Sequence, residues 1–425
     1  MHLAATPLGW MMAVLAATTP PPAAVPQDLM TRVASRLARL TDEPAVRAAL
    51  ADADAGLTRF VDDWVRVAEI PAPSGHEGPR ADYLEKRFRE LGLSEVRRDE
   101  AGNVLGLKPG RRRDLPRVAL LAHMDTVAPA SADHTVRRPR PDRLQGPGVR
   151  DDSSGLAGLL ALLDLMQRHG LQPAADLFVV ASVSEEVGLK GADRFVHENA
   201  ADLGAVIAVD GHLGQISYAA TGILWLKLRF LGDGAHTLRA YEKASPILAA
   251  ARAMERVAAL DIRRTPPEME SWLNIGMMGG GDVPNAQPRE AWFVVDLRSN
   301  DGATFEALER KVRDIAARTA RETGVQVEID TLHRMAGARI PGLESSPLVT
   351  SARAVLDRLG WVAVDLTPRG TADHNVALLR GIPGIAIGMT TGDGAHTPDE
   401  FAEIPPFAIG VKQLLLLTLL PLTPE

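Results

Sequence analysis

The sequence of 425 residues contains no cysteine. Disulfide bonds, thiolate zinc sites and a cysteine nucleophile are therefore excluded. Any bound metal ion must be held by the side chains of histidine, aspartate and glutamate. Aromatic residues make up only 4% of the chain, so we expect a hydrophobic core that is mostly aliphatic.

Basic residues are fewer than acidic ones. The chain has 47 lysine and arginine residues and 54 aspartate and glutamate residues, so its formal net charge is −7. This balance argues against nucleic acid or an anionic membrane surface as a partner. A membrane span is not expected either. The apolar run Leu414–Leu420 is too short to cross a bilayer, and we expect a packed terminal helix there.

The first residues include one apolar segment of signal-peptide length. Leu8–Ala17 precedes small residues and prolines, which favours a cleaved signal peptide within residues 1–27 and an exported or periplasmic protein. No lysine or arginine comes before this segment. A disordered leader or a mis-assigned start, with a cytoplasmic protein, therefore stays open.

The chain length suggests two or three domains. In residues 28–214 short apolar strands alternate with amphipathic helices, and the same alternation returns in residues 333–425. Such alternation predicts an α/β domain with a mostly parallel sheet and helices on both faces. Residues 215–332 also have strand-like and helical stretches, but without this regular alternation. They predict an α+β domain inserted between the two segments of the first.

Histidines and acidic residues follow the predicted strands where each strand ends. Each of them alone fits an ordinary role, such as a helix N-cap or a solvated loop. In open α/β sheets, however, sites form outside the carboxyl ends of the strands, so these segments are expected to meet. The residues concerned are His123, Asp125, Asp151, Asp152, Glu185, Glu186, Asp210 and His396.

Two histidines with several carboxylates and no cysteine suit Zn²⁺ or Mn²⁺. One shared carboxylate can hold two ions about 3.5–4 Å apart, which lower the pKa of a bridging water and polarise a carbonyl oxygen. His123 and Asp125 are two residues apart, so they point the same way on an extended strand. Asp125 is therefore predicted to accept a hydrogen bond from the imidazole and to fix its tautomer.

Several motifs, taken in order, resemble a known family. They are AHMDTV, GPGVRDDSSG, SEEVGLKGA, AVDG, NAQPREAWFVVDLRS, GTADHN, GIPGIAIG and GAHTPDEF. In order and spacing they are similar to the two-zinc metallopeptidases that include peptidase T, aminoacylase and glutamate carboxypeptidase. The resemblance covers roughly residues 70–404.

The resemblance implies two Zn²⁺ ions per subunit, with Co²⁺ or Mn²⁺ as alternatives. It also implies that Glu185 is the general base. The peptide bond between Asp151 and Asp152 is expected to be cis. The implied ligands are His123 and Asp210 for one ion, Glu186 and His396 for the other, and Asp151 as the bridge between them.

For residues 215–332 the resemblance implies a lid that also forms a homodimer. The hexapeptide GDGAHT occurs twice, at residues 232–237 and 392–397, with unrelated flanking sequences. His236 in the first copy is implied to reach the other subunit's site and to stabilise an oxyanion there. His396 in the second copy is implied to bind metal.

Four further residues match positions that bind substrate in the family. Asn285 and Arg298 lie at lid positions that hold a carboxylate or an amide, and an arginine suits a carboxylate. An internal salt bridge between Arg298 and Asp296 stays open. Thr371 and Asp373 lie in the segment GTAD, which resembles the family's substrate loop.

These inferences together predict a metal-dependent hydrolase of peptide bonds in short peptides, a di- or tripeptidase or aminopeptidase of the peptidase T kind. The alternative is a deacylase of N-acyl amino acids on the same two-metal site, because both kinds of substrate end in a carboxylate. A metal-binding protein without hydrolytic activity is disfavoured, because Glu185 is expected to serve only the chemistry.

Overall fold

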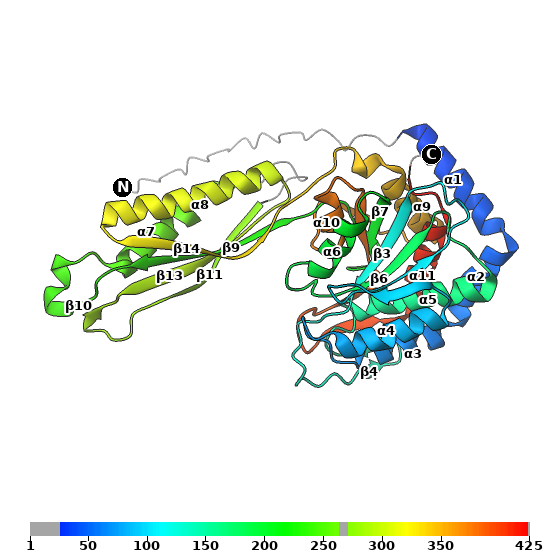
Figure 1. Cartoon of the computed structure of the whole chain (residues 1–425), viewed down its shortest axis with the longest axis horizontal. Coiled ribbons are helices and arrows are strands. Elements are labelled where there is room, and N and C mark those ends of the chain that lie inside the picture. The colour runs from blue at the N-terminus through cyan, green and yellow to red at the C-terminus, as the bar shows by residue number, and fades with distance from the viewer. Residues whose placement is uncertain (1–25, 263–270, 424–425) are drawn as a thin grey trace, which may run out of the picture.

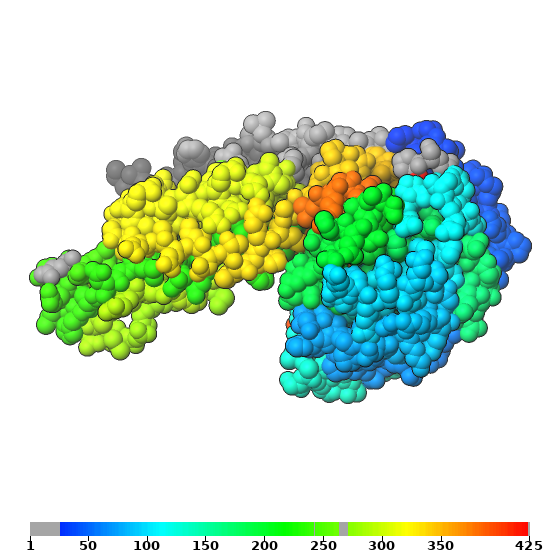
Figure 2. All heavy atoms as spheres, in the orientation of Figure 1, coloured from blue at the N-terminus to red at the C-terminus, as the bar shows by residue number. Residues whose placement is uncertain are grey.

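The computed structural model describes residues 26–262 and 271–423. These residues form an arm, residues 222–335, and a body, which comprises the remaining described residues (Figure 1). The arm projects from the body, and its far end lies well away from it (Figure 2). Residues 1–25 of the predicted leader lie outside the described residues.

An eight-stranded sheet forms the centre of the body, in the order β1-β2-β6-β3-β7-β16-β8-β15. Its four middle strands run parallel. Antiparallel pairs flank them on both sides. The mostly parallel sheet is thus confirmed. The strands are β1 (Ser94–Arg98), β2 (Val104–Lys108), β3 (Arg117–His123), β6 (Leu177–Ser182), β7 (Leu203–Ala208), β8 (Gln215–Ser217), β15 (Asp365–Thr367) and β16 (Gly384–Ile387).

Helices cover both faces of this sheet, as predicted. The largest hydrophobic cluster joins one face to seven helices, and a second cluster joins the opposite face to two. On the first face lie α1 (Gln27–Asp42), α2 (Pro44–Ala55), α3 (Leu57–Ala68), α4 (Gly78–Glu90), α5 (Ser153–His169), α9 (Pro347–Arg358) and α11 (Ile404–Leu419), and on the second α6 (Lys190–Asn199) and α10 (His374–Leu378).

Helix α5 shows how local sequence positions the site. The Asp152 carboxylate accepts a hydrogen bond from the Gly155 N–H at 3.0 Å and caps the helix start. The helix ends at Gly170, whose φ of 62° suits glycine. Both signals are local in the sequence, an aspartate directly before the helix and a glycine directly after it. The helix is buried on nearly all sides, because it lies between the sheet and neighbouring helices.

The arm contains a four-stranded antiparallel sheet, in the order β11-β13-β9-β14, with two helices packed on one face. Alternate residues of β13 are buried, as expected for a strand with one covered and one open face. The division of the chain after residues 214 and 332 stays a prediction. The elements are β9 (Gly222–Leu231), α7 (Pro246–Ala258), β11 (Ser271–Gly280), β13 (Glu290–Ser299), α8 (Gly302–Thr323) and β14 (Gln326–Met335).

Two small sheets and two short 3-10 helices complete the described residues. One sheet joins β4 (Arg137–Arg140), β5 (Arg143–Gln145), β17 (Gly392–Asp393) and β18 (Phe401–Glu403), and the other, at the far end of the arm, joins β10 (Ala235–His236) to β12 (Ala286–Gln287). The 3-10 helices are Thr237–Glu242 and Leu343–Ser345. Throughout residues 26–262 and 271–423, no helix combines the length and hydrophobicity that a membrane span requires.

Candidate metal centre

The five predicted metal ligands meet at the carboxyl ends of the central strands. His123 ends β3, while Glu186 and Asp210 follow β6 and β7. Asp151 comes just before α5, and His396 lies between β17 and β18. The convergence follows from the sheet topology, because parallel strands all present their carboxyl ends at one edge.

These side chains form two groups that share one carboxylate. In the first group, ligand atoms of His123, Asp151 and Asp210 lie within 4.8 Å of one another, and in the second so do those of Asp151, Glu186 and His396. Asp151 Oδ1 lies 3.0 Å from His123 Nε2, and Asp151 Oδ2 lies 3.5 Å from His396 Nε2. Asp151 is thus the residue common to both groups, and its role as a bridging ligand stays a prediction.

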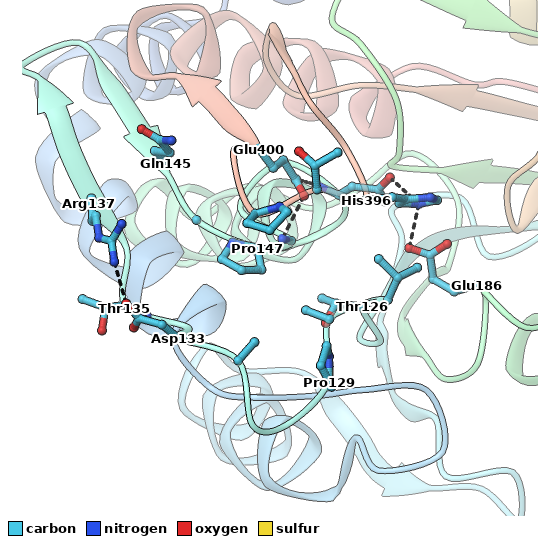
Figure 3. Close-up of a pocket in the computed structure, with 18 residues that line it drawn as sticks. Thr126, Pro129, Asp133, Thr135, Arg137, Gln145, Pro147, Glu186, His396 and Glu400 are labelled. Atoms are coloured by element: carbon cyan, nitrogen blue, oxygen red, sulfur yellow. Dashed lines mark hydrogen bonds and ion pairs between the residues drawn. The ribbon is translucent and has the colours of Figure 1, made fainter.

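The two copies of GDGAHT have different backbone conformations. His236 has a φ of −63°, whereas His396 has a φ of 65°, a left-handed conformation that is rare outside glycine. This conformation belongs to the copy whose imidazole lies 3.1 Å from Glu186 Oε1 (Figure 3). Rare backbone conformations of this kind cluster at functional sites. The same six residues therefore present histidine in two different ways.

Asp125 holds His123 through its main chain and its side chain. Nδ1 of His123 donates to the Asp125 carbonyl at 2.9 Å, and the Asp125 carboxylate lies 3.5 Å away. A protonated Nδ1 leaves the lone pair of Nε2 directed at the shared carboxylate and available to a metal. The carboxylate also accepts hydrogen bonds from the main-chain N–H groups of Glu185 and Glu186. One aspartate thus orients two strand ends of the centre.

The peptide bond between Asp151 and Asp152 is cis, as the resemblance implies. Two acceptors hold this segment. The Asp152 carboxylate accepts the main-chain N–H of His123 at 3.0 Å. The buried carboxylate of Glu400 accepts three main-chain N–H groups, those of Gly148, Arg150 and Asp151, at 2.8–2.9 Å.

The acidic residues of the centre repel one another in a buried space. Burial and the Asp151 charge raise the pKa of Asp210 to about 6. Burial also raises the pKa of Glu186 to about 7, with a further contribution from Asp151. Hydrogen bonding to Asp151, with the nearby charge of Glu186, raises the pKa of His396 to about 9. Concentrated negative charge of this kind favours a bound cation.

The donor set fits divalent metal ions. It consists of two imidazoles and three carboxylates, the ligands that zinc accepts when no thiolate is present. The buried Oε1 atom of Glu186 forms an ion pair with His396 at 3.1 Å but accepts no hydrogen bond from the described residues. A metal ion would satisfy this atom.

A cleft of about 790 Å³ lies between the centre and the inner end of the arm. Its lining includes Asp151, Glu185, Asp210, Arg298 and Thr371. The structure therefore brings predicted metal ligands, the predicted base and two predicted substrate-binding residues to one cleft. Burial raises the pKa of Glu185 well above its usual value, and the Asp210 charge acts in the same direction.

Two of the predicted substrate-binding residues, Arg298 and Asp373, have partners within the chain. Arg298 forms an ion pair with Asp296 at 3.1 Å, the internal bridge that the sequence left open. Asp373 is 3% exposed, and one of its carboxylate oxygens accepts a short hydrogen bond from the Ser182 hydroxyl. Asp373 is therefore held inside the body, whereas Arg298 both pairs internally and lines the cleft.

Strand β10, which contains His236, lies at the far end of the arm, away from the body (Figure 1). His236 belongs to β10, which pairs with β12. The main-chain N–H of Thr237 donates to the Asn285 carbonyl at 3.0 Å. These two predicted residues are thus neighbours of each other but not of the five predicted ligands.

The family model for peptidase family M20/M25/M40 matches residues 119–419, a range that includes every one of these ligands. The chain belongs to this family. It is therefore a hydrolase of the metallopeptidase class, and the family predicted from the motifs is confirmed. Dinuclear metal binding is described for a solved family member, the Bacillus subtilis YXEP protein, at 18% identity and a TM-score of 0.65, covering 86% of this chain and 98% of that chain.

The proteins similar to this chain include both peptidases and deacylases. Peptidase T of Aeromonas hydrophila is 25% identical over 383 residues, which cover 79% of this chain and 90% of the relative. Succinyl-diaminopimelate desuccinylase of Corynebacterium glutamicum is 28% identical over 346 residues, which cover 79% and 89%. A solved tripeptidase of Staphylococcus aureus has a TM-score of 0.75 at 23% identity, covering 86% and 98%.

Sequence reasoning missed two buried residues that support the site. Glu400 was not singled out, because only its tertiary contacts reveal what it binds. Arg80 is fully buried and donates to the main-chain carbonyls of Met124 and Ile70, at 2.7 Å each. It holds the end of β3 next to Asp125, and a helical arginine carries no sequence signal for this role.

Proposed function

We propose that this protein hydrolyses peptide bonds in short peptides with two metal ions, as a di- or tripeptidase or aminopeptidase of the peptidase T kind. The cleft that joins Asp151, Glu185 and Arg298 carries the proposal. It combines the predicted bridging ligand, a buried carboxylate suited to proton transfer and a cation suited to a substrate carboxylate. The relatives named peptidase T support this substrate class.

The metal ions are held by the two groups that share Asp151. Zinc suits their histidine and carboxylate donors, with Co²⁺ or Mn²⁺ as alternatives. When bound, such ions polarise a carbonyl oxygen and lower the pKa of a nearby water.

Glu185 takes the proton from the attacking water and passes it to the leaving amine. It adjoins the ligand Glu186 in sequence and lines the cleft. Its raised pKa favours this role, because a base is most effective when its pKa lies near the working pH.

Arg298 and Thr371 bind the carboxylate end of the substrate. A guanidinium has five N–H donors, and the contacts with Asp296 engage only two of its nitrogens. Arg298 can therefore keep this ion pair and still donate to a substrate.

A homodimer through the arm completes the site. His236 and Asn285 lie too far out on the arm to serve their own cleft, so they serve the cleft of a second copy. The open edge strand β11 supports such an interface, because its Met277 and Met278 are 59% and 67% exposed. His236 of the partner subunit then donates a hydrogen bond to the oxyanion.

The second candidate is deacylation of N-acyl amino acids. Arg298 supports it equally, because such substrates also end in a carboxylate. The relatives named succinyl-diaminopimelate desuccinylase and acetylornithine deacetylase carry out reactions of this type by name.

Amine release from di- and tripeptides and from N-acetyl amino acids tests both candidates. Metal-stripped protein is assayed with and without added Zn²⁺, Co²⁺ or Mn²⁺. Metal-dependent cleavage of peptides with a free N-terminus supports the peptidase. Cleavage of the acylated substrates alone supports the deacylase, and no turnover with any metal contradicts both.

A further inference from the structure

A second cavity, of about 360 Å³, opens on the other side of the metal centre. Figure 3 shows it extending from His396 and Glu186 at one end to Asp133 and Arg137 at the other. Its volume is within the range of about 300–1,000 Å³ that is usual for ligand pockets. The small sheet contributes Arg137 of β4 and Gln145 of β5 to its lining.

This cavity and the cleft meet at the metal centre but are otherwise separate. Both are lined by Val127, Asp151, Glu186 and His396. Arg298 lines the cleft but not the second cavity. A substrate whose scissile carbonyl lies at the shared residues therefore extends in two directions, with its carboxylate in the cleft and its acyl side in the second cavity.

The charged residues of the second cavity other than the predicted metal ligands already have partners. Among the described residues that line it, Asp133 and Arg137 form an ion pair at 2.6 Å. The Glu400 carboxylate accepts three main-chain N–H groups. A charged substrate side chain would have to compete with these contacts, and its loss of hydration would be poorly compensated.

Half of the uncharged wall is made of small apolar residues and prolines, and the rest is threonine, glycine and Gln145. Pro147 faces Thr126 and Pro129 across the cavity (Figure 3). This wall offers dispersion contacts to an aliphatic or aromatic side chain and no new charge. The apolar residues are Val127, Ala128, Pro129, Ala132, Pro147 and Pro398.

We propose that this cavity binds the side chain of the substrate residue on the acyl side of the scissile bond, and that it selects apolar side chains over charged ones. This inference rests on the proposed peptidase function, because Arg298 sets the direction of the substrate. The preferred substrates are peptides with leucine, methionine or phenylalanine at that position. Aspartate and lysine at the same position are poor substrates.

Dipeptides with a constant second residue test the selection. Leu-Gly, Phe-Gly, Gly-Gly, Asp-Gly and Lys-Gly are compared by kcat/KM on the metal-loaded protein. Leu-Gly and Phe-Gly are expected to exceed Asp-Gly and Lys-Gly by at least about tenfold, because a pocket favours added apolar groups by factors of this size.

Ala132→Phe fills the cavity and provides the structural test. It is expected to lower the ratio of kcat/KM for Leu-Gly or Phe-Gly to that for Gly-Gly by about tenfold or more, because Gly-Gly has no side chain to place in the cavity. The matched control is Ala130→Phe, an exposed position in the same loop that does not line the cavity. Gly-Gly turnover also reports whether each variant is folded and metal-loaded.

The outcomes separate this inference from the proposed function. Equal kcat/KM for apolar and charged residues overturns the subsite alone, as does an equal loss of Gly-Gly and Leu-Gly turnover in Ala132→Phe. Absence of turnover for every peptide with any metal overturns the proposed function, and the subsite with it.

Discussion

Several side chains in the metal centre act by holding other groups rather than by binding metal. Asp125 fixes His123 and accepts the N–H groups of Glu185 and Glu186. Glu400 holds the segment that carries Asp151. Such contacts set the directions of the ligands before an ion binds, so their loss is expected to change metal binding as well as stability.

The first residue-scale prediction concerns Glu185→Gln. The variant keeps the size of the side chain but loses the base, so turnover is expected to fall by about 10²–10⁴-fold. Metal content, measured after dialysis, is expected to stay at the wild-type level. Glu186→Gln is the contrasting variant, because it removes a predicted ligand and is expected to lose metal. Wild-type activity in Glu185→Gln would refute the proposed mechanism.

The second prediction concerns Glu400→Gln. The glutamine side chain has only one oxygen that can accept a hydrogen bond. Its NH₂ group then faces a main-chain N–H, which is left without an acceptor. The free energy of unfolding is expected to fall by about 1–3 kcal/mol, the usual cost of an unsatisfied buried group. Denaturant unfolding measures the change, and Zn²⁺ titration is expected to show weaker binding. Asp399→Asn, at the exposed neighbouring position, is the control, and equal stability of the two variants would contradict the prediction.

At the scale of elements, each functional segment is an element end anchored by partners distant in sequence. Helix α5 starts at Asp152, whose carboxylate both caps the helix and binds the end of β3. Helix α10 packs against β7, β16 and α6 and brings a histidine into the interior. His374 is fully buried there.

His374 makes stability depend on pH. Burial lowers its pKa to about 4, from 6.5 in the unfolded chain. Below about pH 6.5 the unfolded chain gains a proton that the folded protein does not, so this contribution to stability is lost as the pH falls toward 4. Relative to wild type, His374→Leu is expected to gain on the order of 2 kcal/mol in unfolding free energy between pH 7 and pH 5.

Denaturant unfolding at several pH values measures this change in the zinc-loaded protein. His197→Leu is the control, because His197 is exposed on α6. A pH dependence that is identical in wild type and His374→Leu would rule out the assignment.

At the scale of the whole molecule, the arm keeps its far end away from the body (Figure 2). Its sheet has an open face and an exposed edge strand, β11. An extended arm with such an edge suits association with a second copy. The proposed site then combines residues of two subunits.

Mixing two inactive variants tests this composite site. His236→Ala lacks the predicted oxyanion donor, and Glu185→Gln lacks the base. After unfolding and refolding together, half of the dimers contain one of each, and one of their two sites is complete. Activity is expected to recover to about a quarter of the wild-type value, whereas each variant refolded alone stays inactive. No recovery in a mixture shown to be dimeric would contradict the shared site.

Local sequence patterns were enough to predict the main strands and helices and the donor types at the site. Apolar strands that end in His123 or before Glu186 and Asp210 are local patterns, and so are the cap and the terminal glycine of α5. The absence of cysteine limited the ligands to imidazoles and carboxylates. These features need no knowledge of distant contacts, because backbone preferences and side-chain chemistry act over a few residues.

Which distant groups share partners became visible in the folded chain. It showed that Arg298 pairs with Asp296 and still lines the cleft, and that Glu400 holds the Asp151 segment from about 250 positions away. It also divided the space around the metal centre into two cavities. Burial, pairing and cavity shape depend on how remote elements pack, so they emerge only when the whole chain is folded.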